Sequence, residues 1–551
     1  MTPALADLSP PRAALLCAVP LVYALAALAP GRVARDLRTG WRMARWGAAL
    51  AVMAALMSLA WLLASQAGLA RGPELWTLGR AGALRLSLRS DPLGCTMLLL
   101  VTFIGWVITG YSQPYLDAER GQQRYLRGLL LTLAAVSLLV LTNNLLVLAG
   151  AWIVTSLALH GLLTFFEQRP QALIAAHKKF LASRVADLCL LGGIALLGTT
   201  LGTLEIDQAI AAAQALGRTP PPLQAAALLL ACSALLKCAQ LPVHGWLIQV
   251  MEAPTPVSAL LHAGVVNLGG FLLIRLSTLV TGVPAAQALL VVVGSVTAVV
   301  AALVMTTRIS IKVALAWSTC AQMGFMMMEC GLGLHDLALL HLVAHSPYKA
   351  HAFLCAGGAV ELNRLQQLTP PPAAPRPLAW LLGALLSLGL VGSAAALCAI
   401  PVARAPALWA MAAILSMALV PMLAAQVVQG GGRWRWVGLL AGFGVALAYF
   451  GLHLAASHWL GAPDLGGAAS PGLVTWVLAC FGVLFAVQAS VRIWPHGALA
   501  RQMYPWLFAG LYLDELFTRL TFRVWPARLP AANAGMAWSA ATITSRTPGT
   551  R

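Results

Sequence analysis

Charged residues are scarce in this chain. Only 9% of its 551 residues are Asp, Glu, Lys or Arg, whereas 60% are hydrophobic. Soluble domains carry roughly 25% charged residues, so the composition excludes a soluble globular protein and predicts an all-α polytopic membrane protein. The first ten residues also lack the basic segment of a cleavable signal peptide, and the segment after Pro11 is therefore expected to be a retained helix.

Cysteine pairs with metal-binding spacing are also missing. The chain has ten cysteines, none in a Cys-x-x-Cys pair, and almost all of them lie within apolar segments. This pattern supports neither a metal site nor a disulfide framework, and no cofactor is expected in this chain. The net charge of +18 comes from arginines clustered in short loops, which is typical of membrane topology, so no nucleic-acid partner is expected.

The apolar residues form about fifteen segments that are long enough for transmembrane helices, which need about 20 residues. These segments lie near residues 11–30, 46–68, 93–112, 127–142, 144–166, 184–202, 223–242, 255–280, 285–306, 311–331, 336–359, 377–400, 405–428, 436–457 and 472–491. An amphipathic stretch, 504–525, follows them. The small-residue and polar tail after it is expected to be disordered.

Basic loop residues predict the orientation in the membrane. Alternate loops are rich in Arg and Lys, including the loop with Arg169, Lys178 and Lys179, and such loops face the cytoplasm. The loop that carries Arg71, Arg80, Arg85 and Arg89 is an exception to this alternation. We expect a multi-pass protein of the bacterial inner membrane, with a periplasmic N-terminus and a cytoplasmic C-terminus.

Lysine is rare, with five residues against thirty arginines, and three of the five lie in or at the edge of apolar segments: Lys237, Lys312 and Lys349. An ammonium near the middle of a bilayer costs about 2.5–3.5 kcal/mol on insertion scales, so it persists only where it faces protein or water. Burial also suits a lysine to proton exchange. These lysines are therefore candidate proton relays, although Lys312 begins a helix and an interfacial anchor is the alternative.

Histidines accompany the lysines in the same apolar surroundings. His341, His345 and Lys349 follow one another at i, i+4 spacing, which places three bases on one helix face and predicts a water-lined path. Zinc binding by the two histidines is disfavoured, because no third ligand is apparent and a lysine lies beside them. Glu252 is expected to be either a gate at the cytoplasmic end or a partner for a lysine. Glu329 and Asp336 flank a loop and are expected to face solvent.

Three ordered blocks of sequence carry a family resemblance. They are Lys237–Leu247 with Met251–Ala263, then Lys312–Phe325, and then His341–Leu354. The blocks resemble the proton-translocating antiporter-like subunits of respiratory complex I and the related Mrp cation/proton antiporters, over roughly residues 90–365. The resemblance implies inverted repeats with broken helices.

The same resemblance implies roles for single residues. Lys237 would be the proton-holding lysine on a broken helix, with His262 as a bridge beside it. A central polar axis would continue through Lys312, His341, His345 and Lys349. Arg184 and Asp187 match an intramembrane ion pair of the family, and their i, i+3 spacing places them on one helix face.

The sequence also departs from the family pattern in two places. Ile153 stands directly after Trp152, where the family has a glutamate that pairs with the broken-helix lysine; His160 and Glu167 are the nearby candidates to replace it. No lysine follows Lys349, and the segment 377–400 has neither an acid nor a base. The second half therefore lacks its terminal titratable group, which disfavours a complete complex I-type pump.

These departures, together with the Lys349–Leu354 variant and the short C-terminus, resemble a narrower branch, the DabB-type subunit. That resemblance implies a large zinc-containing, carbonic-anhydrase-like DabA-type partner on the cytoplasmic side. The membrane chain would use a proton or Na⁺ gradient to energise inorganic carbon accumulation, while zinc and catalysis would belong to the partner. Asp514 and Glu515 would dock the partner. There are two alternatives. The chain could be an ion-translocating subunit of a complex I-like or Mrp-type antiporter, or it could be a non-conducting membrane anchor for a peripheral enzyme.

The expected organisation of the chain follows from these assignments. Five regions are predicted: N-terminal transmembrane helices (1–92), a first antiporter-like half with a broken helix around 237–255 (93–280), a second half with the polar axis (281–457), a C-terminal helix with an amphipathic docking segment (458–526), and a disordered tail (527–551).

Overall fold

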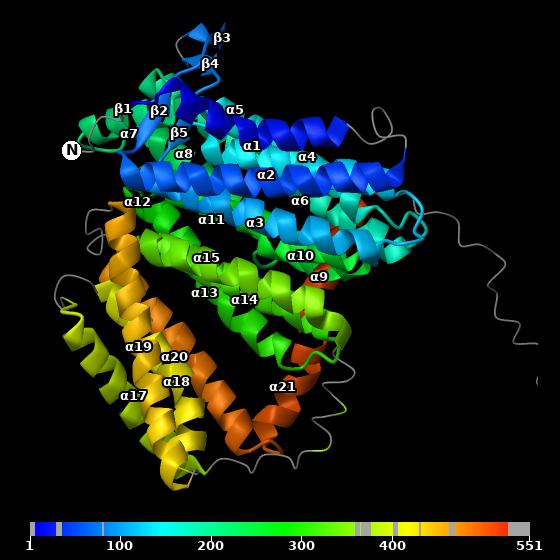
Figure 1. Cartoon of the computed structure of the whole chain (residues 1–551). Helices are drawn as coiled ribbons and strands as arrows, with labels where there is room; N and C mark the ends of the chain where they lie inside the picture. The colour runs from blue at the N-terminus through cyan, green and yellow to red at the C-terminus, as the bar shows by residue number, and fades with distance from the viewer. Residues whose placement is uncertain are drawn as a thin grey trace, which may run out of the picture.

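The computed structural model describes residues 6–28, 36–79, 82–358, 364, 368, 376–400, 406–428, 431–461 and 469–526. The predicted tail, 527–551, lies outside these residues. Long helices run alongside one another through most of the molecule (Figure 1). The helices of the first part are α1 (Pro10–Leu28), α2 (Leu37–Ala64), α3 (Pro92–Tyr115), α4 (Gln122–Leu141), α5 (Leu145–Leu163), α6 (Pro170–Leu201), α7 (Ile206–Ala215) and α8 (Pro221–Lys237).

The chain continues through short helices into the second part of the bundle. The segments around the break are α9 (Gly245–Gln249), a 3₁₀ turn (Val250–Glu252), α10 (Thr255–Ala263), a 3₁₀ turn (Val265–Asn267), α11 (Leu268–Arg275) and α12 (Ser277–Thr281). The later helices are α13 (Pro284–Met305), α14 (Ile311–Gly331), α15 (His335–Leu354), α17 (Pro377–Leu397), α18 (Pro406–Leu423), α19 (Gly432–Leu460), α20 (Pro471–Ile493), α21 (Ala498–Phe508) and α22 (Leu513–Val524).

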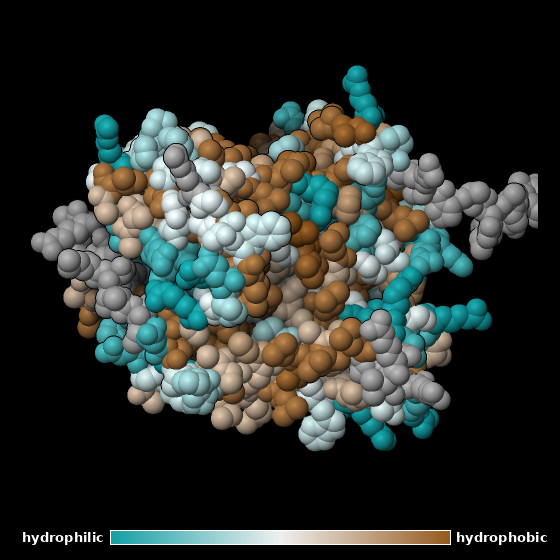
Figure 2. All heavy atoms as spheres, turned by 90° about the horizontal axis from the view of Figure 1, so that it is seen from above, coloured by the Kyte–Doolittle hydropathy of each residue, from teal (hydrophilic) through white to brown (hydrophobic). Residues whose placement is uncertain are grey.

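A helix occupies each predicted transmembrane segment. Within the described residues, 12 helical segments are long and apolar enough to cross a membrane, and α8 is a shorter apolar helix. The two remaining positions are α14 and α15, which carry the polar axis. Large apolar side chains on α2, such as Trp46 and Leu50, are exposed, as expected for a lipid-facing surface. Apolar side chains are spread over the face seen in Figure 2.

Short strands cover one end of the bundle, which is called the sheet end below. Strand β2 (Gly68–Ala70) pairs in parallel with β1 (Ala6–Asp7) and antiparallel with β5 (Leu88–Ser90), and β3 (Glu74–Thr77) pairs with β4 (Ala83–Arg85). Three arginines of the exceptional basic loop pair with acids here: Arg71 with Asp207 (3.3 Å), Arg85 with Glu74 (2.8 Å) and Arg89 with Asp91 (2.7 Å). Arg80 lies outside the described residues. The ion pairs of Arg71 and Arg89 attach this loop to α7 and to the start of α3.

A buried ion pair joins α11 to the start of α3 at the sheet end. Arg275, which is 5% exposed, donates to the Asp91 carboxylate, and Arg89 contacts the same oxygen. Burial alone would raise the pKa of Asp91, but the charges of Arg275 and Arg89 hold it below its ordinary range. The pair fixes the end of the broken region α10–α12 against α3.

Two glycines bring α13 and α14 into backbone contact. A Cβ at Gly294 would lie 2.6 Å from the Gly324 carbonyl oxygen, and a Cβ at Gly324 would lie 2.6 Å from the Gly294 carbonyl oxygen. Small residues allow this approach between membrane helices. The contact positions Thr297 of α13 against the break that follows α8, where its hydroxyl accepts a hydrogen bond.

Gly324→Leu is expected to destabilise the protein strongly, because a leucine cannot fit against the α13 backbone without separating the two helices. Overpacking costs about 1–3 kcal/mol, and more where backbone must move. The measurement is the fraction of folded, monodisperse protein in detergent and its thermal midpoint. Gly389→Leu on α17 is the matched control, since no atom lies within 4 Å of a Cβ there. Equal stability of the two variants would contradict the packing argument.

The last helices pack against the first part through α19. Helix α19 contacts α15 on one side and α17 on the other (Figure 1). The Trp459 indole donates to the Thr96 hydroxyl (3.0 Å), which places the end of α19 beside the start of α3 at the sheet end. Because α19 lies between them, α17 is separated from the polar side chains of α15.

Candidate proton-relay site

The chain breaks immediately after Lys237. Ala239 has a left-handed φ of 51°, and the Gln240 N–H donates to the Leu235 carbonyl (3.2 Å), which closes the end of α8. The Leu241 N–H donates to the Thr297 hydroxyl (3.2 Å). Unsatisfied backbone groups are not tolerated within a membrane, so these bonds make a non-helical segment possible there.

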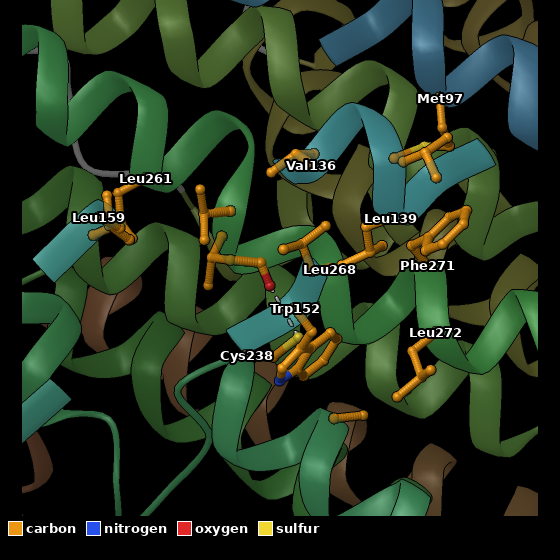
Figure 3. Close-up of a cluster of buried hydrophobic side chains, with 14 of the residues drawn as sticks. Met97, Val136, Leu139, Trp152, Leu159, Cys238, Leu261, Leu268, Phe271 and Leu272 are labelled. Carbon is orange, nitrogen blue, oxygen red and sulfur yellow. Dashed lines mark hydrogen bonds between the residues drawn. The ribbon is translucent and has the colours of Figure 1, made fainter. Parts of the chain in front are cut away.

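Lys237 is held against an aromatic face. The residue is 3% exposed, and its Nζ lies 4.5 Å from the centre of a Trp152 ring on α5. Trp152 is fully buried and lies beside Cys238 in an apolar cluster (Figure 3). The Lys237 Nζ has no hydrogen-bond partner among the described residues. A buried amine held mainly by a cation–π contact is suited to exchange its proton with water or a neighbouring base.

Asp187 supplies a carboxylate near Lys237. It lies on α6, is 4% exposed, and is 2.7 Å from Arg184, which confirms the pair predicted from the i, i+3 spacing. Its charge acts on Lys237 and also on Lys179. These four residues, Arg184, Asp187, Lys179 and Lys237, are called the first cluster below.

Of the two candidate replacements for the acid missing at Ile153, Glu167 lies at the surface, whereas His160 lies within electrostatic reach of Lys179 and Arg184. Glu167 pairs with Arg124 and is 66% exposed, so it lies at the surface. The His160 ring packs against Phe180, with 5.4 Å between ring centres. The Asp187 carboxylate is therefore the acid whose charge reaches the broken-helix lysine.

Lys178 and Lys179 do not lie in a loop, and this prediction was wrong. Helix α6 begins at Pro170, and both lysines are buried, at 0% and 2% exposure. Lys179 Nζ donates to the carbonyl and the hydroxyl of Ser156 at 2.6 and 2.9 Å. Adjacent lysines are typical of a loop, but polar groups from other helices satisfy both of these lysines inside the bundle.

Lys178 links the C-terminal segment to the bundle. Its Nζ donates to Asp514 of α22 (2.7 Å) and to Gln249 of α9 (3.1 Å), and Gln249 also donates to Asp514 (2.7 Å). Asp514 is thus engaged within this chain, while Glu515 is exposed. The predicted docking of a partner at these two acids stays a prediction, with Glu515 as the accessible group.

The polar axis is assembled on α15 and its neighbours. Lys349 is fully buried, and its Nζ donates to the Ser318 hydroxyl (2.7 Å) and the Leu315 carbonyl (3.3 Å) of α14. His262 of α10 is fully buried and stacks on Phe353. The charges of His262 and Lys349 both act on His345.

His341 extends this group towards the sheet end. Its ring centre is 6.1 Å from that of His345, and its Nδ1 is 3.2 Å from Glu329 Oε2. The second cluster, as the term is used below, comprises His262, Lys349, His345, His341 and Glu329.

Glu329 and Asp336 do not face solvent, and this prediction was also wrong. They are 3% and 8% exposed, and each carboxylate contacts a histidine: Glu329 contacts His341, and Asp336 Oδ2 lies 2.7 Å from His453 Nδ1 of α19. The turn between α14 and α15 is covered by packing against α13 and α19, which removes these acids from the surface.

Lys312 and Glu252 lie towards the end opposite the sheet. Lys312 is half-buried, and its Nζ donates to the Thr255 hydroxyl (2.9 Å) at the start of α10. Glu252 is about half-exposed and lies 3.8 Å from Arg169, so its cationic neighbour is an arginine and not a lysine. The relay and gate roles of these two residues stay predictions.

The end of α17 repeats the backbone geometry of the end of α8. Ala399 has a φ of 52°, and the Ile400 N–H donates to the Ala395 carbonyl (3.1 Å), as Gln240 donates to Leu235. The local sequences agree as well, with Cys398-Ala399 matching Cys238-Ala239. Leu397, which is 69% exposed, therefore occupies the position that corresponds to Lys237. The structure thus identifies the position at which the second half lacks a base.

Comparisons with known proteins agree with this architecture. Residues 142–430 match the NADH:quinone oxidoreductase/Mrp antiporter transmembrane family, and residues 76–126 match the N-terminal family of complex I chain 5. A probable inorganic carbon transporter subunit DabB of Hydrogenovibrio crunogenus is 42% identical over 80% of this chain and 83% of its own length. A probable subunit DabB2 of Halothiobacillus neapolitanus is 37% identical over 94% of this chain and 95% of its own length.

A solved structure shares the fold. A chain in the Mrp complex from Dietzia sp. DQ12-45-1b superposes with a TM-score of 0.62 at 25% identity, over 93% of this chain. The match spans 59% of that longer Mrp chain. The predicted antiporter-like helical fold is confirmed by this similarity.

Proposed function

This chain belongs to the DabB-type inorganic carbon transporter subunits of the complex I and Mrp antiporter superfamily, and we propose that it conducts protons to energise carbon accumulation by a partner. The observation that carries the proposal is the pair of buried clusters. Each holds a buried lysine, Lys237 or Lys349, next to other titratable side chains. Buried bases within membrane helices mark proton pathways.

Proton transfer would run between the two clusters. Lys237 would take a proton from one side of the membrane, with Asp187 stabilising its charged form, and would return it towards His262 and Lys349. Each transfer needs hydrogen-bond reach or one bridging water. The exchange performs work only if the protonation of Lys237 biases a conformational change shared with the partner, because a passive path would dissipate the gradient.

The partner we propose is a large zinc-containing, carbonic-anhydrase-like subunit on the cytoplasmic side. It would hold the zinc and hydrate CO₂ to bicarbonate and a proton, while this chain would supply the driving force. The exposed Glu515 on α22 gives the C-terminal segment a carboxylate that a cationic partner surface could reach. The preponderance of amines and imidazoles favours protons over Na⁺, which prefers oxygen ligands.

The test of this assembly is affinity purification of the chain from its native membrane in mild detergent, followed by mass spectrometry and zinc analysis. We expect one large soluble-domain partner that carries zinc and hydrates CO₂. Co-elution of several small membrane subunits, or of quinone and iron–sulfur proteins, would contradict the proposal and favour an antiporter or respiratory assembly. Glu515→Lys is expected to weaken the co-elution, whereas Glu74→Lys at the sheet end is not.

A further inference from the structure

The sheet ends of α14, α15 and α19 hold two carboxylate–histidine contacts. Glu329 Oε2 lies 3.2 Å from His341 Nδ1, and Asp336 Oδ2 lies 2.7 Å from His453 Nδ1. All four side chains are at most 16% exposed. Tyr449, one helical turn before His453, lies within electrostatic reach of both carboxylates. Five titratable groups from three helices therefore meet at one end of the bundle.

The position of this group relates it to the missing base. The second half has Leu397 where a relay base would stand, and Leu397 is exposed at the end of an apolar helix that α19 separates from α15. The path that arrives at His341 cannot continue through a leucine. The acids that contact His341 and His453, Glu329 of α14 and Asp336 of α15, lie towards the sheet end.

We propose that Glu329 is the terminal proton acceptor of the second cluster, and that the Asp336–His453 pair connects it to the aqueous phase at the sheet end. This inference rests on the proposed proton conduction. In the step, the Nδ1–H bond of a His341 imidazolium breaks and an O–H bond forms on the Glu329 carboxylate, which leaves a neutral imidazole and a carboxylic acid. The heavy-atom separation lies at the limit of direct transfer, about 2.6–3.2 Å.

The next step passes the proton outwards. Protonated Glu329 would return its proton to water or to Asp336, and His453 would accept it where α19 approaches the membrane surface. The predicted orientation places the sheet end outside, so the site would exchange protons with the periplasm. The same groups would take up protons if the flow were reversed, because each transfer is reversible.

A purely structural role makes a different prediction. Ion pairs of this kind can hold α19 against α15, and breaking a buried pair costs about 3–5 kcal/mol. In that case, activity would follow stability in every variant, whether or not the new residue can carry a proton. A relay instead requires a side chain that titrates at position 329.

The experiment compares Glu329→Gln with Glu329→Asp in the complete complex, in membrane vesicles with a pH-sensitive dye. Glutamine keeps a hydrogen-bond acceptor for His341 but cannot be protonated. We expect at least a tenfold loss of proton flux in Glu329→Gln and substantial flux in Glu329→Asp, at equal amounts of folded complex. The matched control is Glu167→Gln, which removes a surface carboxylate paired with Arg124.

Infrared difference spectroscopy gives a second readout. A protonated-carboxyl band that appears on acidification of the sheet-end side and is lost in Glu329→Gln would support the relay. Full flux in Glu329→Gln, or equal losses in the glutamine and aspartate variants that follow thermal stability, would overturn it. If the Lys237 variant blocks flux and Glu329→Gln does not, only this inference fails; if the unmodified complex conducts no protons at all, the proposed function fails with it.

Discussion

Lys237→Ala is expected to abolish proton-coupled carbon accumulation while the chain still assembles with its partner. The substitution removes the amine that faces Trp152 and leaves Asp187 and Arg184 as a neutral pair. General acid–base groups contribute about 10²–10⁴-fold to proton-transfer rates, so a loss of at least about 100-fold in flux is expected. Proton flux in vesicles and uptake of radiolabelled inorganic carbon by whole cells are the two measurements.

Stability separates a relay from a packing role for Lys237. Because the alanine variant removes a buried amine that lacks a hydrogen-bond partner among the described residues, we expect folding and partner binding to be retained. Lys237→Met preserves the side-chain volume and is expected to be as inactive as the alanine variant. Lys312→Met, at a half-buried position whose relay role stays a prediction, is measured alongside it. Full coupled activity in Lys237→Met would remove the relay from the mechanism.

The helices and the family were accessible from sequence because both depend on local signals. Apolar runs of membrane-spanning length predicted each of the fifteen helical positions. The blocks around Lys237, Lys312 and His341 carried the resemblance to the antiporter-like subunits. Element ends were less accurate. Helix α6 begins at Pro170, whereas its predicted segment begins at residue 184. The Lys178-Lys179 pair is typical of a loop, but here it belongs to a buried turn of the helix.

Contacts between distant segments were beyond sequence reasoning. Lys178 is buried because Asp514, 336 residues later in the chain, reaches it from α22. Asp336 is covered because α19 brings His453 against it. Both acids look solvent-exposed when judged from their neighbours in sequence, and only the packing of helices decides otherwise. Strand β1 was missed for the same reason, since it pairs with β2 across α1 and α2, whereas β3 and β4 form a local pair.

The sequence around the end of α17 contains a pattern that predicts a second helix break. Cys238-Ala239 and Cys398-Ala399 are followed within three residues by a proline, and both alanines adopt left-handed φ at a helix end. The repeated pattern alone would have aligned Leu397 with Lys237. The composition of 377–400 shows that a base is absent, and the backbone geometry shows that Leu397 stands in its place.

Asp187→Asn is expected to reduce proton flux at least tenfold, which corresponds to about 1.4 kcal/mol. Asparagine is similar in size but removes the charge that offsets the amines of Lys237 and Lys179. The first cluster would then hold the cations of Arg184 and the two lysines with no carboxylate of its own. Protonation of Lys237 would become less favourable, so the relay would stay empty during turnover.

Rescue variants distinguish this electrostatic role from packing. Asp187→Glu restores the charge and is expected to recover most of the flux, since its carboxylate can still reach Arg184 at i−3. Asp117→Asn, at an exposed position after α3, is the matched control and is expected to leave flux unchanged. A second site gives a sharper comparison: Ile153→Glu in the Asp187→Asn background places a carboxylate directly after Trp152. Recovery of flux there would show that the charge near Lys237 matters more than its position, whereas unchanged flux in Asp187→Asn alone would exclude the carboxylate from the relay.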